Sequence, residues 1–373
     1  MEAKAAEVTL PPMVAAAVGY RIEGGGLKEQ DPLSGDIIDD PFDLSDTDLI
    51  YYKEHFYSKT ANHDTYFAGD ASPCCVSLIK KPDSGEYYAL IRTKEGNTRV
   101  VVDKNAVKRG FLRKLLGMAP STADKLKALN HGIPVNRLKL STDPRVQDAL
   151  LNIEEKQTIK GFKFGILYAQ EGQTKEDEMF ANVDTTPEFE EFIDFLGERV
   201  KLNGWPHFRA GLDVKNGTTG DVGLFIRWNN NEIMYHVSTL LPFNPLDKQQ
   251  LERKRHIGND IVVIVFQDGD TVYRPTTISS RQVHVVFLVK AVTLPEDPGV
   301  RYYRLSVISK DGVPPFGPPI PVESCYKAGP EFKNLFYRKL LNAERACYKA
   351  PMLDNKLVRT RAALLEDLAK TYT

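Results

Sequence analysis

The most informative part of the chain reads Gln249-Gln250-Leu251-Glu252-Arg253-Lys254-Arg255-His256-Ile257-Gly258-Asn259-Asp260, followed by Ile261-Val262-Val263-Ile264-Val265-Phe266. The polar, basic part predicts a helix over 246–256 that stops at Gly258. The run after it is rich in β-branched residues, which predicts a fully buried strand over 260–266. Asn259 therefore lies at the junction between a helix and a strand.

The chemistry of Asn259 makes this junction a candidate site. A side chain held between two rigid elements loses little conformational entropy when it enters a partner's site. Its carboxamide carries both a donor and an acceptor, so it can orient a water beside a phosphate group, as phosphoryl transfer requires. A role in ending the helix stays open, because Gly258 and Asn259 both tolerate left-handed backbone. The run 253–256 is equally open to interpretation as a solvated face, a nuclear signal or a phosphate-contacting patch.

The rest of the chain predicts an α/β protein in three parts. Over 156–373, apolar strands alternate with helices such as the amphipathic segment 187–202, which predicts an α/β sandwich. Residues 46–155 predict a smaller α+β domain. In that domain, residues 106–132 have helical spacing, and their Lys and Arg residues are read as a solvated face. Residues 1–45, with Gly24-Gly25-Gly26 and an acidic, proline-marked run, predict an irregular or disordered lead-in, with an acidic docking segment as the alternative.

Composition excludes several classes of function. The 373 residues include 49 basic and 50 acidic side chains, and this balance argues against a nucleic-acid partner. Four cysteines without a CxxC pair predict reduced thiols and no structural metal site. The apolar runs are shorter than the ~20 residues of a membrane span, and no secretory signal begins the chain, so we expect a cytoplasmic protein. The GxxxxGK[ST], GxSxG and HExxH motifs are missing from the sequence, so no P-loop nucleotide site is predicted.

The segment 253–260 resembles the signature of the Rap GTPase-activating protein (Rap/Ran-GAP domain) family. Further segments resemble that family in the same order: Phe162-Lys163-Phe164-Gly165, Gly172-Gln173-Thr174, Pro187-Glu188-Phe189, Phe208-Arg209-Ala210-Gly211-Leu212-Asp213, Glu232-Ile233-Met234-Tyr235-His236-Val237-Ser238-Thr239, Pro315-Phe316-Gly317-Pro318-Pro319, Gly329-Pro330-Glu331-Phe332 and Asn342-Ala343-Glu344. The resemblance is dense over about 156–366 and weaker over 48–155, where residues 103–145 diverge.

This resemblance implies a fold and an activity. The catalytic part would resemble a G domain without its P-loop, preceded by an α/β domain that mediates dimerisation in some members. The divergence of 103–145 leaves a homodimer open here. The chain would activate GTP hydrolysis by a Rap-type small GTPase in its GTP form. GTP and Mg²⁺ would be carried by that partner, so the chain would need no cofactor and would not be a GTPase by itself.

The resemblance also implies roles for individual residues. Asn259 matches the catalytic asparagine, or asparagine thumb, which orients the attacking water in trans. His256 and Arg255 would contact the GTPase or fix the thumb, and Lys163 would support the interface, with a structural ion pair as an equal alternative. Arg253 and Lys254 complete the basic binding patch, and both arginines would dock the partner rather than serve as an arginine finger. The alternatives are an activator of a Rheb- or Ral-type GTPase and a non-catalytic scaffold that binds a GTPase.

Overall fold

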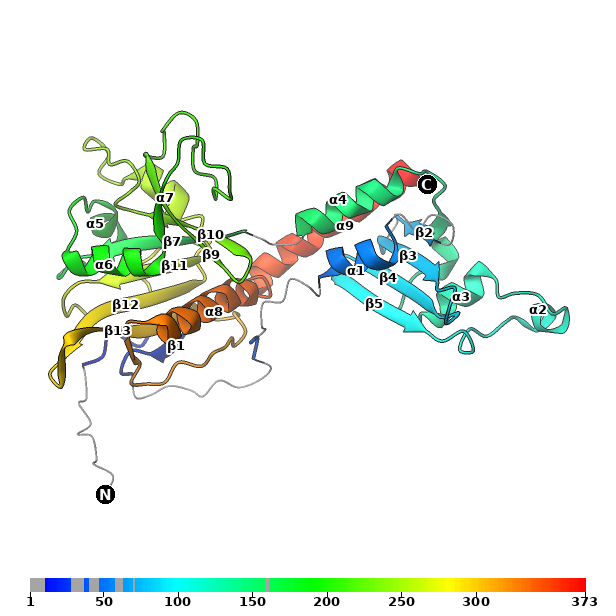
Figure 1. Ribbon diagram of the computed structural model, residues 1–373, viewed down its shortest axis with the longest axis horizontal. Helices are drawn as coiled ribbons and strands as arrows, with labels where there is room; N and C mark the ends of the chain where they lie inside the picture. The colour runs from blue at the N-terminus through cyan, green and yellow to red at the C-terminus, as the bar shows by residue number, and fades with distance from the viewer. Residues whose placement is uncertain (1–10, 28–36, 40–46, 58–62, 70, 158–160) are drawn as a thin grey trace, which may run out of the picture. The chain divides into compact units, whose positions relative to one another are not determined.

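The chain folds as two units, and each mixes helices with a β-sheet (Figure 1). The computed structural model describes residues 11–27, 37–39, 47–57, 63–69, 71–157 and 161–373. Unit 1 combines Met1–Phe42 with Lys160–Pro351, and unit 2 combines Asp43–Ile159 with Met352–Thr373. The predicted α/β class is confirmed. The units differ from the predicted parts, because residues 352–373 belong to unit 2 rather than to the same unit as 160–351.

The sheet of unit 1 is built around β11 (Val262–Gln267), the β-branched run seen in the sequence. β11 runs parallel to its neighbours β7 and β12, and its residues are buried, as expected for a strand covered on both faces. The strand order is β1-β13-β12-β11-β7-β10-β9-β8, with β14 paired to β13. The remaining bounds are β1 Tyr20–Gly24, β7 Gly161–Ala169, β8 Glu198–Lys201, β9 Val222–Trp228, β10 Asn231–Val237, β12 Val285–Leu294, β13 Asp297–Lys310 and β14 Cys325–Lys327.

Helices cover both faces of this sheet. The Phe192 ring of α6 (Pro187–Leu196) lies 5.3 Å from the ring of Phe266 in β11 and 6.2 Å from that of Phe336 in α8 (Pro330–Cys347). Successive β11 side chains alternate in direction, so Val263 and Val265 face the opposite side. There they pack with α7 (Leu251–Ile257) and α5 (Glu176–Phe180), which Figure 1 shows above β7 and β11, whereas α8 packs against the face of Phe266 and Phe287 through Phe336.

Helix α7 is shorter than predicted, because it begins at Leu251 rather than near residue 246. Pro245 has no amide hydrogen to donate, and Gln250 adopts a left-handed backbone with φ of 48°. The Asp247 carboxylate accepts a hydrogen bond from the amide of Leu251 at 2.7 Å. Residues 244–250 therefore form a turn that caps α7 instead of extending it.

The lead-in contains a strand that the composition did not predict. β1 pairs antiparallel with β13, and Glu23 of β1 is buried. Its carboxylate accepts a hydrogen bond at 2.7 Å from the ammonium of Lys339 in α8, which is also buried. Burial lowers the pKa of Lys339 to about 8 despite this pairing. Tyr20–Gly24 is therefore part of the sheet of unit 1, whereas residues 1–10, 28–36 and 40–45 of the predicted lead-in lie outside the described residues.

Unit 2 is an antiparallel sheet with helices on its faces. Its strand order is β5-β4-β3-β2-β6, with bounds β2 His63–Ala68, β3 Cys74–Lys80, β4 Tyr87–Thr93, β5 Gly96–Val102 and β6 Lys139–Leu140. One face carries α1 (Asp48–His55), α4 (Val146–Gln157) and α9 (Pro351–Tyr372), whose apolar side chains share a core with the sheet. In the part of the chain that the structure describes, no helix in either unit is long and apolar enough to cross a membrane.

Residues 106–132 differ from the continuous helical pattern of the sequence. They form two short helices, α2 (Phe111–Leu115) and α3 (Thr122–Ala128), and α2 ends where Gly117 adopts a φ of 64°. Ser121 and Asp124 then form a capping box that starts α3. A glycine and a capping box between two apolar segments therefore split the predicted helix in two.

Candidate functional site

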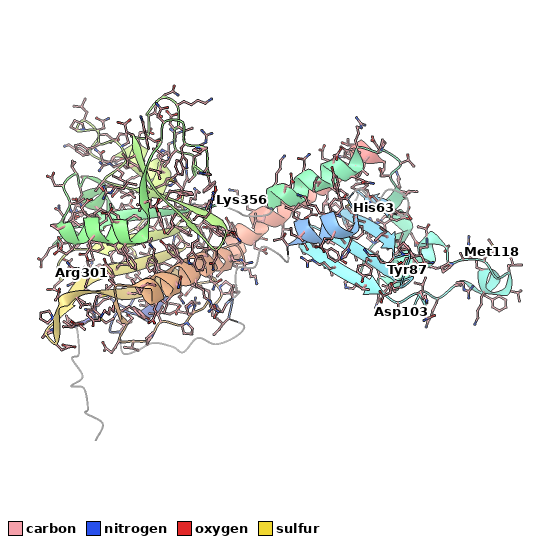
Figure 2. All side chains as sticks on the ribbon, viewed as in Figure 1. His63, Tyr87, Asp103, Met118, Arg301 and Lys356 are labelled. Carbon is pink, nitrogen blue, oxygen red and sulfur yellow. The ribbon has the colours of Figure 1, made fainter. Side chains whose placement is uncertain are left out.

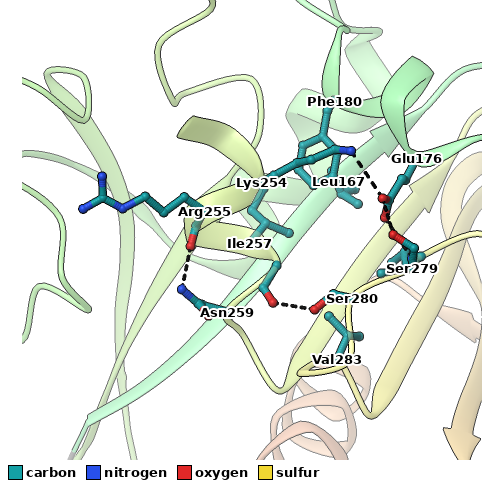
Figure 3. Close-up of a pocket in the computed structure, with 12 residues that line it drawn as sticks. Leu167, Glu176, Phe180, Lys254, Arg255, Ile257, Asn259, Ser279, Ser280 and Val283 are labelled. Atoms are coloured by element: carbon teal, nitrogen blue, oxygen red, sulfur yellow. Dashed lines mark hydrogen bonds and ion pairs between the residues drawn. The ribbon is translucent and has the colours of Figure 1, made fainter. Parts of the chain in front are cut away.

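Asn259 lies in a tight connection between α7 and β11, as the sequence predicted. Its amide donates to the carbonyl of His256 at 3.1 Å, and its own carbonyl accepts from the ammonium of Lys163 at 3.1 Å. The side chain is exposed, and its Nδ2 donates to the carbonyl of Arg255 at 3.0 Å (Figure 3). None of the described residues donates to Oδ1. The backbone is thus fixed, the residue is exposed, and Oδ1 is left without a hydrogen-bond donor among the described residues.

A buried ionic network lies directly behind this connection. The carboxylate of Asp260 is fully buried, with Oδ1 at 3.0 Å from Nζ of Lys163 and Oδ2 at 2.8 Å from Nδ1 of His236. The other ring nitrogen of His236 lies 3.0 Å from the carbonyl of Ala210. The ion pair that sequence analysis kept as the alternative for Lys163 is therefore present. In addition, Lys163 holds the backbone of Asn259.

Glu344 of α8 contributes a second buried carboxyl group near this network. Burial raises its pKa to about 8; the hydroxyl of Tyr348 donates to Oε1 at 2.9 Å and opposes the rise, while the charge of Asp260 adds to it. The Glu344 side chain is therefore largely protonated at neutral pH. The carboxyl groups of Asp260 and Glu344 thus differ in environment: Asp260 pairs with the Lys163 ammonium and the His236 imidazole, whereas Glu344 accepts a hydrogen bond from Tyr348.

Arg253 is placed differently from the prediction that it docks a partner. Its side chain is 1% exposed, and its guanidinium donates to the carbonyls of Phe180 at 2.8 Å and Asn182 at 2.7 Å and to those of Leu241 and Pro242. Burial lowers the pKa of Arg253 to about 10, which still leaves it charged at neutral pH. Arg253 therefore links two segments of the chain to α7 from inside the protein. Its side chain offers no surface that a partner protein could contact.

The other basic residues of α7 form its accessible face. Arg255 is exposed, and its nearest anionic partner is Glu252 at 3.6 Å. Lys254 is half-buried between Glu176 and Asp177; these partners raise its pKa although burial acts in the opposite direction. Arg255 is therefore the more accessible of these two cations.

His256 lies at the same helix end and is half-buried beside the ring of His236, at 5.2 Å between centroids. Burial lowers the pKa of His256, and the charges of His236 and Arg255 act in the same direction. The ring is therefore mainly neutral at pH 7, so it offers one donor and one acceptor rather than a positive charge.

A pocket of about 290 Å³ opens beside Asn259 (Figure 3). The hydroxyl of Ser280 donates to the carbonyl of Gly258 at 2.6 Å, and Ser279 is held by Glu176. Both apolar and polar residues line the pocket: Leu167, Glu176, Phe180, Lys254, Arg255, Ile257, Gly258, Asn259, Ile278, Ser279, Ser280 and Val283. The end of α7 is thus supported on the pocket side as well as on the side of Lys163.

Gly165 of β7 allows α7 to approach the sheet closely. A Cβ atom at this position would lie 2.7 Å from Cγ2 of Ile257 and 3.2 Å from Oδ2 of Asp260. Any larger side chain would therefore push against the helix end that presents Asn259.

The structure brings five of the six predicted site residues to one helix and its C-terminal junction, with Lys163 joining them from β7. The supporting residues Asp260, His236, Ser280 and Gly165 were not assigned roles from the sequence. A carboxylate at the entry to a buried strand is the signal that points to Asp260, because such a group needs a partner. In the described residues, no cluster of three His, Cys, Asp or Glu side chains is suited to hold a metal ion.

Comparisons with known proteins show similarity to Rap/ran-GAP proteins. A family profile described as Rap/ran-GAP matches residues 179–362. A PH and Rap-GAP domain-containing protein of Dictyostelium discoideum is 38% identical over 327 residues, which cover 84% of this chain and 27% of that protein. Signal-induced proliferation-associated 1-like protein 3 of Mus musculus is 38% identical over 336 residues, with coverage of 86% and 18%. The chain therefore spans less than a third of the length of either relative.

A solved structure of the TSC2 GAP domain is also similar to this chain. It is 32% identical, with a TM-score of 0.44, and the match covers 52% of this chain and 99% of that one.

Proposed function

This chain belongs to the Rap/ran-GAP family, and from that membership we propose that it activates GTP hydrolysis by a Rap-type small GTPase. The observation that supports this most directly is the geometry of Asn259. Its backbone is fixed by Lys163 and by the end of α7, the residue is exposed, and its Oδ1 is unpaired among the described residues. A carboxamide presented this way enters a partner's active site without paying a large ordering entropy.

In the proposed mechanism, the GTPase carries GTP and Mg²⁺, and this chain supplies a group that the GTPase lacks. Oδ1 of Asn259 would accept a hydrogen bond from the attacking water and orient it toward the γ-phosphate. The carboxamide stays neutral, so it adds no repulsion against the phosphate. Activators of this general kind accelerate hydrolysis by ~10³–10⁵.

The other residues would act through position rather than through charge at the phosphate. Lys163 and Asp260 would keep the connection after α7 rigid, and Arg253 would hold α7 to the loops beneath it. Arg255 and His256 would contact the GTPase beside the thumb. The burial of Arg253 supports a mechanism without an arginine finger from that position.

Single-turnover GTP hydrolysis by purified Rap, Rheb and Ral, each with and without this chain, tests the proposal. We expect acceleration of Rap, a loss of at least ~10²-fold with Asn259→Ala, and unchanged binding of the GTP-loaded GTPase. Asn216→Ala, a change to another exposed asparagine of unit 1, is the matched control and should keep full activity.

The same experiment separates the alternatives. Acceleration of Rheb or Ral alone would move the assignment to that branch. Binding of a GTPase with no acceleration by the wild-type chain would identify a scaffold. Full activity in Asn259→Ala would refute the role of the thumb, and hydrolysis of GTP by the chain alone would refute the proposal altogether.

A further inference from the structure

The connection between β5 and α3 in unit 2 concentrates positive charge in a chain that is otherwise balanced. Between Asp103 and Asp124 the sequence has five basic residues and no acidic residue, although the whole chain has a net charge of −1. We call residues 104–119 the basic loop; its cations are Lys104, Lys108, Arg109, Arg113 and Lys114. Within the described part of the chain, Lys108 and Lys114 form no ion pair.

Large apolar side chains are exposed among these cations. Phe111 is 81% exposed, Leu115 is 74% exposed and Leu116 is 64% exposed, and Met118 is exposed as well. Figure 2 shows Met118 far from the sheet of unit 2, on the segment that leaves β5 at Asp103. Single exposed apolar residues are ordinary on protein surfaces, but four within eight residues form a patch that indicates an interaction site.

The basic loop is a formed structure, so these side chains are presented on a scaffold. Helix α2 ends in a Schellman motif, in which the amide of Met118 donates to the carbonyl of Arg113 at 2.9 Å and the amide of Gly117 to that of Lys114 at 3.4 Å. The guanidinium of Arg109 donates to the carbonyl of Met118 at 3.3 Å and links the segment before α2 to the segment after it. At its base, Val107 is buried in the core of unit 2.

We propose that the basic loop binds an anionic lipid surface, with Phe111, Leu115 and Leu116 inserted among the acyl chains and the flanking cations at the headgroups. Interleaved large apolar and basic side chains are the chemistry that interfacial membrane binding requires. Clusters of this number of Lys and Arg side chains are also attracted to anionic headgroups, with about 1 kcal/mol for each cation.

Charge and size argue against the other occupants of this surface. A second copy of the chain docked through the same patch in a symmetric dimer would place two sets of cations against each other. A stable protein interface uses about 20–30 residues on each side, whereas the exposed part of the loop from Lys108 to Ala119 is much shorter. A lipid surface needs neither a large contact area nor a matching shape.

Sedimentation of the full chain with vesicles of phosphatidylcholine, with and without phosphatidylserine, tests this proposal. We expect binding only to vesicles with phosphatidylserine, and weaker binding at higher ionic strength. Phe111→Ser with Leu115→Ser should lower the partition coefficient at least ~10-fold. Lys108→Gln with Lys114→Gln should lower it about five-fold for each charge.

Matched controls change similar residues elsewhere. Leu246→Ser removes an apolar side chain that is 92% exposed in unit 1, and Lys201→Gln with Lys215→Gln removes two exposed charges there. Both controls should leave vesicle binding unchanged. All loop variants should activate a soluble GTPase in the absence of vesicles as the wild type does, so failure of lipid binding is distinguishable from failure of the proposed activity.

Three outcomes would overturn the proposal. The first is no binding of the wild-type chain to phosphatidylserine vesicles at low ionic strength. The second is equal binding by the wild type and both loop variants, which would place the lipid contact elsewhere. The third is a dimer of the wild type that the loop variants disrupt, without any vesicle binding, which would make the loop a self-association surface.

Discussion

Replacing Arg253 with alanine is expected to destabilise unit 1 rather than to remove a contact with a partner. The substitution would leave the buried carbonyls of Phe180, Asn182 and Leu241 without the guanidinium donor. Each buried carbonyl left unsatisfied costs roughly 1–3 kcal/mol, and water that enters the vacated space offsets part of that cost. We therefore expect the free energy of unfolding to fall by about 3–5 kcal/mol.

Urea unfolding of Arg253→Ala and Arg255→Ala, followed by tryptophan fluorescence, measures this difference. Arg255 is exposed, so its removal should change the free energy of unfolding by less than about 0.5 kcal/mol. The free energy of unfolding of Arg253→Lys should lie between those of Arg253→Ala and Arg255→Ala, because one ammonium group cannot reach both loops as the guanidinium does. A stability of Arg253→Ala within about 1 kcal/mol of wild type, together with lost activity, would refute the structural role and restore the docking role.

Three further predictions concern buried groups. Glu344→Gln should flatten the pH dependence of the free energy of unfolding, measured by denaturant titration at several pH values. The pKa of Glu344 in the folded protein, about 8, lies above its ordinary value, so the folded wild type binds more protons than the unfolded chain. The wild type therefore loses stability as the pH rises toward about 8, and the variant should not. Lys339→Met should lower the free energy of unfolding by about 3–5 kcal/mol because Glu23 loses its cation, and adding Glu23→Gln should recover part of it; equal loss in both variants would contradict this pairing. Gly165→Ala should cost about 1–3 kcal/mol in unfolding and lower GTPase activation more than GTPase binding, since the new methyl group displaces the helix that presents Asn259; unchanged activation would contradict that account.

Local pattern was sufficient for the elements around the site. The β-branched run became β11, and the amphipathic segment from Pro187 became α6, with Phe189, Phe192, Ile193 and Leu196 buried. The helix ends at Leu196 rather than at residue 202, because the backbone turns extended at Gly197 and Glu198–Lys201 pair with β9 as strand β8. The junction at Asn259 followed from the helix pattern that ends at Gly258 and the β-branched run that becomes β11. Periodicity and β-propensity decide such elements because the side chains that face the core recur within a few residues.

Long-range pairing was beyond the reach of the same reasoning. Glu23 reads as part of a polar, glycine-rich segment, and its burial is explained by distant partners, the ammonium of Lys339, 316 residues away, and the amide of Ile320. Arg253 reads as one of several surface cations, because the carbonyls that surround it come from loops over 70 and about 11 residues away. The neighbouring residues in the sequence do not distinguish a buried arginine from an exposed one. The sequence therefore placed Arg253 correctly in a helix but predicted an exposed docking residue where the structure has a buried one.

The origin of α9 in the chain has a consequence for how unit 2 is made. Leu365, Leu368 and Ala369 of this helix belong to the same core cluster as Phe67 and Leu90 of the unit 2 sheet. Ribosomes add residues in order, so that sheet emerges long before the helix that completes its core. During synthesis, the face of the unit 2 sheet that α9 covers therefore stays partly exposed while nearly all of unit 1 is translated. A fragment cut before residue 352 would leave that face permanently exposed, and we expect it to aggregate even though the cut lies outside the unit 2 sheet.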